Sequence, residues 1–263
     1  MSQAKCSDES RSAGTRVVVL DLVDSTNAEA LRRAGAGERG PLWIVAKEQS
    51  AGRGRRGRGW TSVAGNLHAT LLMTDPSLPA VAPQLGFVAG LALHDAAAAA
   101  ASSLASRLAL KWPNDLLCAG RKIAGILVEG EGDPLAVAVG IGVNCHRHPD
   151  AAEFPATDFA SEGIDVSAAV LFDDLAAAMD VRLQEWNRGA GFADIRAAWL
   201  ARAAGVGEPV RVRLSGRELA GRFETIDDSG RLMLRTGPGD GHGNLEAIAA
   251  GDVFPFDRTR RAE

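Results

Sequence analysis

The sequence has few cysteines and none of the common motifs that bind phosphate or metal. Its three cysteines, Cys6, Cys118 and Cys145, show neither CxxC spacing nor the spacing of a disulfide framework. We therefore expect reduced thiols without a metal or redox role, in a reducing compartment. Neither GxxxxGKS/T nor a GxGxxG motif opening a helix is present, which excludes the common phosphate-binding loops. His146 and His148 form a lone His-x-His pair, which we expect at the surface, and no residue cluster predicts a metal site.

A signal peptide and a membrane span are also missing from the sequence. Residues 1–14 are polar and small, with no apolar stretch of seven or more residues, so they predict a disordered tail. Residues 85–110 carry few charges and include six consecutive alanines at 96–101, but His94, Asp95 and Arg107 interrupt the apolar run. A span needs roughly 20 apolar residues, whereas alanine is weakly hydrophobic and a good helix former. We expect a long buried helix there and a cytoplasmic protein with no membrane partner.

The charge is balanced overall and strongly basic in one place. A formal net charge of −4 over 263 residues argues against a general nucleic-acid binder. Residues 49–60, here called the arginine–glycine loop, contain four arginines, four glycines and no acidic residue. Like charges repel and glycine frees the backbone, so we expect the isolated loop to be mobile and to order around a phosphate or carboxylate. Arginine suits such anions because its planar fork donates two parallel hydrogen bonds.

Hydrophobic patterning predicts two domains. Strands are expected at 16–23, 42–47, 66–73, 108–112, 116–118, 122–128 and 135–143, and helices near 26–33, 85–110, 170–187 and 192–204. Thr26 and Glu29 have the spacing of a capping box at the start of the first helix. Consecutive strands with segregated helices indicate an α+β fold with a mixed sheet flanked by helices, over residues 15–204.

The pattern changes after Gly205. Val210, Val212 and Leu214 alternate with polar residues, and tight turns separate further short strands up to residue 234. Residues 236–244 are rich in glycine and predict a loop. Short strands with tight turns are typical of a small β-barrel, so we place a second domain at residues 205–257.

Five segments together resemble the biotin protein ligases. They are Asp-Ser-Thr-Asn at 24–27, the arginine–glycine loop from Gly52 to Trp60, Lys-Trp-Pro-Asn-Asp at 111–115, the stretch from Arg121 to Glu129, and Gly-Ile-Gly-Val-Asn at 140–144. The resemblance covers about residues 16–255. It implies a class II synthetase-like catalytic domain and an SH3-like C-terminal barrel.

The resemblance also implies a reaction and its partners. Such an enzyme activates biotin with ATP, accompanied by Mg²⁺, to biotinyl-5′-AMP. It then transfers biotin to a lysine of a biotin carboxyl carrier protein. Only 23 residues precede Asp24, so we expect no DNA-binding domain and no DNA partner. Monomer and homodimer both stay open.

The same resemblance assigns roles to individual residues. Lys122, Arg53 and Asp115 are implied to be catalytic, with Arg53 nearest the reacting groups and Asp115 orienting or deprotonating the incoming lysine. Biotin would be bound by Ser25, Thr26, Asn27, Gln49, Gly52, Arg53, Gly54, Arg55, Lys122 and Gly125. ATP and the adenylate would be bound by Arg53, Arg55, Trp60, Lys111, Asn114, Lys122 and Asn144, with Trp60 offering an aromatic face to adenine.

Taken alone, the residues allow other readings. Residues 25–27 can be a helix cap, and Lys122, unpaired in an apolar strand, can extend its ammonium to the surface. Asp115 can stabilise a turn. His68 stands where the family commonly has an aromatic or aliphatic residue. The alternatives for the whole chain are a lipoate or octanoate ligase or transferase and, from another class, an RNA-binding protein that uses the arginine–glycine loop.

Overall fold

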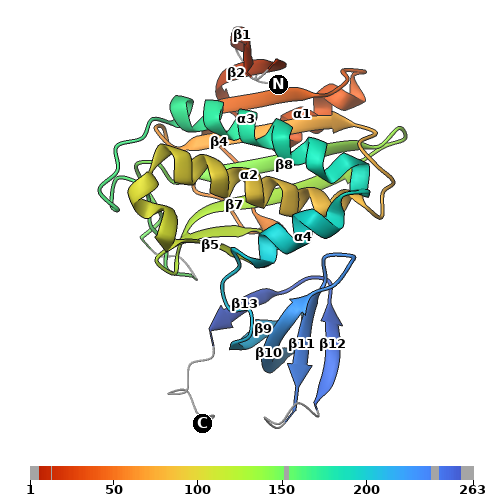
Figure 1. Ribbon diagram of the computed structural model, residues 1–263. Coiled ribbons are helices and arrows are strands. Elements are labelled where there is room, and N and C mark those ends of the chain that lie inside the picture. Colours follow the sequence, from red (N-terminus) through yellow and green to blue (C-terminus); the bar gives the residue numbers. More distant parts are fainter. Residues whose placement is uncertain (1–5, 13, 151–153, 238–242, 256–263) are drawn as a thin grey trace.

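A computed structural model describes residues 6–12, 14–150, 154–237 and 243–255 of the chain. The main body carries a sheet of eight strands, and a smaller unit with a five-stranded sheet lies beneath it (Figure 1). This arrangement confirms the α+β prediction, a mixed sheet flanked by helices with a small C-terminal β domain. No helix among the described residues is long and apolar enough to cross a membrane.

The large sheet is mixed. Its strands lie side by side in the order β1 (Cys6–Ser12), β2 (Thr15–Val23), β3 (Leu42–Gln49), β4 (Leu67–Thr74), β8 (Ala136–Val143), β7 (Arg121–Glu131), β6 (Asp115–Cys118) and β5 (Leu108–Lys111). Of these strands, β2 and β3 pair in parallel, joined by α1 (Thr26–Gly35), and the other neighbours are antiparallel. The sheet therefore contains one strand–helix–strand crossover within a chain of antiparallel pairs.

Helices cover both faces of this sheet. On one face, α2 (Leu85–Ala100), α3 (Ala168–Trp186) and α4 (Phe192–Leu200) lie in front of the strands in Figure 1. Their core cluster includes Trp43 and Leu71, whereas Ile44 and Leu72 belong to a second cluster that includes Leu31 of α1. Consecutive strand residues point to opposite faces, so α1 packs on the other face.

Three details differ from the sequence-based expectation. Residues Cys6–Ser12 form β1, paired antiparallel with β2, where we had predicted a disordered tail; residues 1–5 and 13 lie outside the described part. The cap of α1 is Ser25, one residue earlier than predicted, and its hydroxyl accepts from the Ala28 amide. The predicted capping box of Thr26 and Glu29 is therefore wrong, since the residue three positions after the cap is an alanine. The alanine-rich helix α2 ends at Ala100, because Ala101 adopts a non-helical conformation and a 3₁₀ turn, η3 (Ser102–Arg107), follows.

The C-terminal sheet has the order β12 (Asn244–Ile248), β11 (Leu232–Thr236), β10 (Glu218–Ile226), β9 (Pro209–Arg213) and β13 (Asp252–Pro255). All its pairs are antiparallel. The sequence analysis did not predict β12 and β13. The loop predicted at 236–244 falls mainly on residues 238–242, outside the described part.

The two sheets are held together by specific contacts. Trp112 is buried and directly follows β5 in the sequence, and it donates its indole N–H to the Gly230 carbonyl at 3.0 Å. Gly230 has a φ of +86°, and a Cβ there would lie 2.7 Å from the Phe87 ring, so only glycine fits this turn. Since Trp112 adjoins Lys111, the C-terminal unit is fixed to a segment that the sequence places in the site.

Candidate active site

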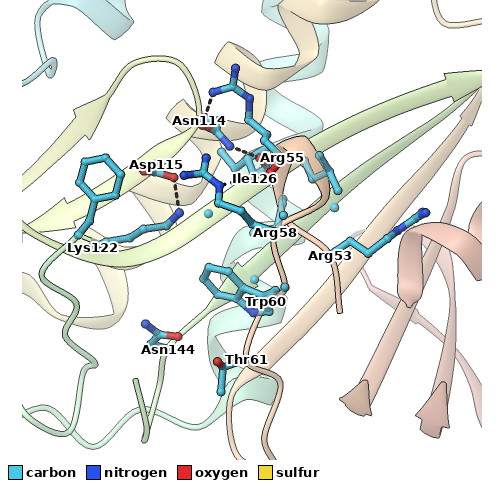
Figure 2. A pocket seen from close by; sticks show the side chains of 18 of the residues that line it. Arg53, Arg55, Arg58, Trp60, Thr61, Asn114, Asp115, Lys122, Ile126 and Asn144 are labelled. Atoms are coloured by element: carbon cyan, nitrogen blue, oxygen red, sulfur yellow. Dashed lines mark hydrogen bonds and ion pairs between the residues drawn. The ribbon is translucent and has the colours of Figure 1, made fainter. Parts of the chain in front are cut away.

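A cavity of about 300 Å³ brings together the five segments that the sequence analysis singled out. Its lining comes from the start of α1, the arginine–glycine loop, the β5–β6 turn, β7, β8 and, from the C-terminal unit, Asp252 and Val253. All the predicted site residues except Gly52 are among the residues that line it. Figure 2 shows the cationic part of this cavity.

One end of the cavity is neutral and polar. Gln49, at the end of β3, accepts from the Thr26 amide at 2.9 Å and from the Thr26 hydroxyl at 3.1 Å, and it donates to the Ser62 hydroxyl at 2.8 Å. Ser25 and Thr26 are buried at 4% exposure each. A primary amide has two N–H groups, and no described residue accepts the second one of Gln49. We call Ser25, Thr26 and Gln49 the polar floor.

The wall beside the polar floor is built by glycines and an indole ring. A Cβ on Gly142 would lie 2.6 Å from the Trp60 ring, and one on Gly125 would lie 3.2 Å from it. Trp60 therefore lies against the sheet, in space that a side chain larger than glycine at position 125 or 142 would fill. Gly52 similarly makes room, because its Cβ would lie 2.6 Å from the Ser62 hydroxyl and 3.1 Å from the Gln49 amide nitrogen.

A β-bulge puts Lys122 and Gly125 on the same side of β7. The register with β6 shifts between Leu116 and Leu117, so that Ile123 and Ala124 are both fully buried in the core. Without the extra residue, positions three apart on a strand would face opposite sides. The bulge directs the Lys122 ammonium to the cavity, 5.4 Å from the centre of the Trp60 ring.

The other end of the cavity is cationic around one carboxylate. Lys122 Nζ lies 2.6 Å from Asp115 Oδ1, and Lys111 Nζ lies 3.8 Å from Asp115 Oδ2. The alternative of an unpaired Lys122 is therefore wrong, since Asp115 is its partner (Figure 2). Burial lowers the pKa of Lys111 to about 8, although Asp115 opposes the shift. The Lys111 ammonium also lies 3.2 Å from the centre of the Phe154 ring.

The arginines of the loop have partners outside the loop. Arg53 pairs with Glu129 at 3.1 Å, and Arg55 donates to the Asn114 side chain and the Gly251 carbonyl, both at 3.3 Å. Arg58 and Arg56 pair with Asp252, at 2.9 and 3.4 Å. Burial lowers the pKa of Arg55, which stays a cation. A 3₁₀ turn, η1 (Arg55–Gly57), shapes the tip of the loop.

Three asparagines predicted to bind ligand are engaged with protein groups. Asn27 donates to the Leu127 carbonyl and to Glu129 and accepts from Thr70. Asn114 donates to the Ile126 carbonyl at 2.6 Å, and Asn144 donates to the Thr157 carbonyl at 3.0 Å. These side chains hold the strands around the cavity, and their roles toward a ligand stay predictions.

Sequence reasoning missed several residues that contact the site. Glu129 and Thr70 hold the Arg53 and Asn27 side chains, and Asp252 holds two arginines from another domain. Phe154 stacks on Phe254 with ring centres 4.5 Å apart, beside Lys111. Glu129 ends the motif from Arg121 to Glu129, so the sequence could have predicted that it lies near the site. No motif includes Asp252 or Phe254, so the sequence around them does not predict their contacts with the site.

The cavity thus has a neutral hydrogen-bonding floor, a glycine and indole wall, and a cationic end. It suits a ligand with a neutral polar head, an apolar body and an acidic tail that meets a second anion. In keeping with this, residues 19–145 match the "Biotin/lipoate A/B protein ligase family" and residues 205–254 match the "Biotin protein ligase C terminal domain". The class is therefore that of the protein ligases of the biotin and lipoate type.

Individual relatives narrow the class. A biotin–[acetyl-CoA-carboxylase] ligase of Paracoccus denitrificans is 48% identical over 90% of this chain and 99% of its own length. The structure of a biotin protein ligase from Aquifex aeolicus in complex with biotin and ATP matches with a TM-score of 0.74 and 25% identity, over 90% of this chain and 97% of that chain. A ligase from Leishmania major in complex with biotinyl-5-AMP matches with a TM-score of 0.60 and 25% identity, over 89% of this chain and 98% of that chain. The chain belongs to the biotin protein ligase family.

Proposed function

We propose that this cavity activates biotin with ATP and transfers it to the ε-amino group of a lysine on a biotin carboxyl carrier protein. The observation that supports the proposal is the order in which polar, apolar and cationic groups line the cavity, from the polar floor through the apolar wall to the cationic end. Biotin has the same order, since a ureido head is followed by a thioether ring, an alkyl chain and a carboxylate. The names of the relatives support this assignment.

In the first step, a biotin carboxylate oxygen attacks the α-phosphorus of ATP and pyrophosphate leaves. Two anions must meet, so fixed cations at the reacting oxygens contribute most. Lys122, Arg55 and Arg53 are our assignments for that task, since all three line the cavity. Lys111, Asn114 and Asn144 border the same end and are assigned to the nucleotide, and the aromatic face of Trp60 is assigned to adenine.

In the second step, the acceptor amine attacks the carbonyl carbon of the mixed anhydride. The bond from that carbon to the phosphate oxygen breaks, AMP leaves and the amine loses a proton. Asp115 is our assignment for orienting the amine and accepting that proton, because its carboxylate lies at the cavity with only 9% exposure. Its pairing with Lys122 supports this assignment, since the carboxylate lies 2.6 Å from a cation that we assign to the phosphate.

Mg²⁺ is proposed only as the companion of ATP. Among the described residues no group of three or more His, Cys, Asp or Glu side chains could hold a metal ion. Magnesium in nucleotide sites is commonly held by one or two carboxylates and the substrate phosphates. An ion that arrives with ATP therefore does not need a larger group of protein ligands. The proposed steps rely on the protein cations alone.

The polar floor also distinguishes biotin from the lipoate alternative. The dithiolane ring of lipoate has no carbonyl oxygen to accept the second N–H of Gln49, and a polar group left unpaired when a ligand covers it costs about 1–3 kcal/mol. A site built to hydrogen-bond its substrate rejects an analogue that lacks those groups. The floor therefore favours biotin.

The proposal also covers the compartment, the domain limits and the acceptor. Cys118 and Cys145 are free and buried, which supports a reducing compartment, and we propose the cytoplasm. We propose domain limits of 15–204 and 205–257 because the second sheet starts at Pro209 and the C-terminal family match begins at residue 205. A carrier protein is the proposed acceptor, because a carboxylase is named in the relative.

The test uses the purified protein with ATP, Mg²⁺ and a biotin carboxyl carrier domain. We expect a carrier that gains one biotinyl group, detected by intact-mass spectrometry, and no gain when the acceptor lysine is replaced by arginine. Lipoate or octanoate in place of biotin should give little product. Transfer of lipoate in preference to biotin, or RNA binding without any transfer, would contradict the proposal.

A further inference from the structure

Arg53 is directed away from the cations that surround Asp115. Figure 2 shows its side chain pointing to the opposite side of the view from Arg55 and Lys122. Its Nη2 atom lies 3.1 Å from Glu129 Oε2, on the part of β7 that follows the cavity-lining residues. A residue assigned to the reacting anions is thus held by a carboxylate of the protein itself.

Glu129 is joined to the interior of the cavity as well. Its Oε2 atom also accepts from the Asn27 amide at 2.9 Å. Asn27 is 3% exposed, and its Oδ1 accepts from the Thr70 hydroxyl at 2.7 Å, while Thr70 lies 2.8 Å from the Thr26 hydroxyl. A series of hydrogen bonds therefore runs from Thr70, which lies beside Thr26 of the polar floor, through Asn27 and Glu129 to Arg53.

The two partners of Glu129 differ in how firmly they are fixed. Asn27 is buried in the first turn of α1 and its side chain makes three hydrogen bonds, whereas the Arg53 side chain is 45% exposed and belongs to the loop. The Glu129 side chain is 30% exposed, so water weakens its pairing with Arg53. This ion pair can therefore be replaced by a stronger anion, while the bond to Asn27 persists.

We infer that Glu129 is a positioning residue that holds the Arg53 guanidinium away from the cationic end of the cavity until an anionic ligand replaces the carboxylate. The inference rests on the proposed function for the identity of that ligand, a biotin carboxylate or an α-phosphate. Arg53 exchanges one oxygen anion for another, so its charge is paired in both states. The ligand must compete with Glu129, and the pairing consequently lowers the apparent affinity of the site for anions.

The test compares the wild-type protein with Glu129→Gln. Glutamine keeps an oxygen that accepts from Asn27 but removes the charge that attracts Arg53. Because exposed ion pairs contribute little, we expect a stable biotinyl-adenylate analogue to bind about two- to five-fold more tightly to this variant. In an Arg53→Gln background the same change should have no effect, which calorimetric titration of the four proteins measures as a double-mutant cycle.

Glu131→Gln is the matched control, because Glu131 is an exposed carboxylate two residues further on the same strand. Equal tightening in this control, or tightening that persists without Arg53, would mean a general charge effect and overturn the inference. Weaker binding to Glu129→Gln would mean that Glu129 holds Arg53 in its productive position, which also overturns it. If Glu129→Gln does not fold, Glu129→Asp moves the carboxylate away by one methylene, and the same comparison applies.

Inorganic pyrophosphate serves as a second probe and separates the two proposals. If the wild-type protein does not bind the adenylate analogue, the proposed function fails. The pyrophosphate affinity of the four proteins still measures the competition between Glu129 and an anion for Arg53. If the wild-type protein and the Glu129→Gln variant bind pyrophosphate with the same affinity, the inference fails even when the enzyme is active.

Discussion

The contact between the arginine–glycine loop and the C-terminal domain makes a quantitative prediction for Asp252→Asn. Asp252 is the first residue of β13, and its side chain is 11% exposed. Its two oxygens lie 2.9 Å from Arg58 and 3.4 Å from Arg56. Asparagine has the same shape and keeps one acceptor, so the substitution removes the charge and little else.

The magnitude follows from the exposure of the arginines. Arg58 and Arg56 are 42% and 36% exposed, so each pair contributes at most about 1 kcal/mol. Losing both weakens docking of the loop on the C-terminal domain by up to about 2 kcal/mol. If only the docked loop binds ligand, the affinity falls in proportion to the fraction of protein with a docked loop. The loss is then up to about 30-fold.

Calorimetric titration with a stable biotinyl-adenylate analogue measures this loss. The control is Asp228→Asn in the same domain, where the carboxylate is 96% exposed and pairs with Arg196 on α4. We expect the control to bind like the wild-type protein and both variants to melt close to the wild-type temperature, because Trp112 still fixes the C-terminal unit. An Asp252→Asn variant with the affinity of the control would refute the reasoning.

Three further predictions concern single residues of the cavity. Because burial lowers the pKa of Lys111 to about 8, the lysine loses its charge as the pH rises past that value. The affinity for ATP, measured by titration at a series of pH values, should therefore fall between about pH 7 and pH 9. Lys111→Arg should remove this pH dependence, because arginine keeps its charge. Gly142→Ala places a methyl group 2.6 Å from the Trp60 ring and should weaken biotin binding at least about 10-fold by fluorescence titration, whereas Gly59→Ala, with no atom within 4 Å of its Cβ, should not. Lys122→Ala should reduce the rate of adenylate formation more than the affinity for biotin, and an equal loss in both would mean that the lysine only binds substrate.

Much of the fold was readable from the sequence because its signals are local. Alternating or continuous apolar runs predicted β2, β3, β4, β7 and β8 within a few residues. The five motifs predicted which segments meet in the cavity, and all of them do. Local patterns suffice where one segment of chain determines its own conformation.

Other features depended on pairing across the chain. The segment Cys6–Ser12 is polar and has no strand signal of its own, and it is ordered by the edge of β2. Asp24, Ser25 and Thr26 are neighbouring residues that can each cap a helix. Thr26 is engaged with Gln49, and Ser25 is the residue that caps α1. Neither choice is encoded within a window of a few residues.

The partners of charged groups were the least predictable part of the site. The bulge at Ile123 aligns Lys122 with Asp115, and it depends on core packing on the opposite face. Asp252 lies far along the chain from the arginines it pairs with, as 194 positions separate it from Arg58. Sequence identifies the residue types that chemistry needs, whereas their mutual distances come from the fold.

The central claim is that this cavity joins a biotin carboxylate to the α-phosphate of ATP. A rapid-mixing measurement of pyrophosphate released by the wild-type protein, with ATP and Mg²⁺ but without a carrier, tests it most directly. The account predicts a burst of one pyrophosphate per protein that requires biotin and leaves biotinyl-5′-adenylate in the site. Release that does not depend on biotin, or that lipoate supports equally well, would contradict it.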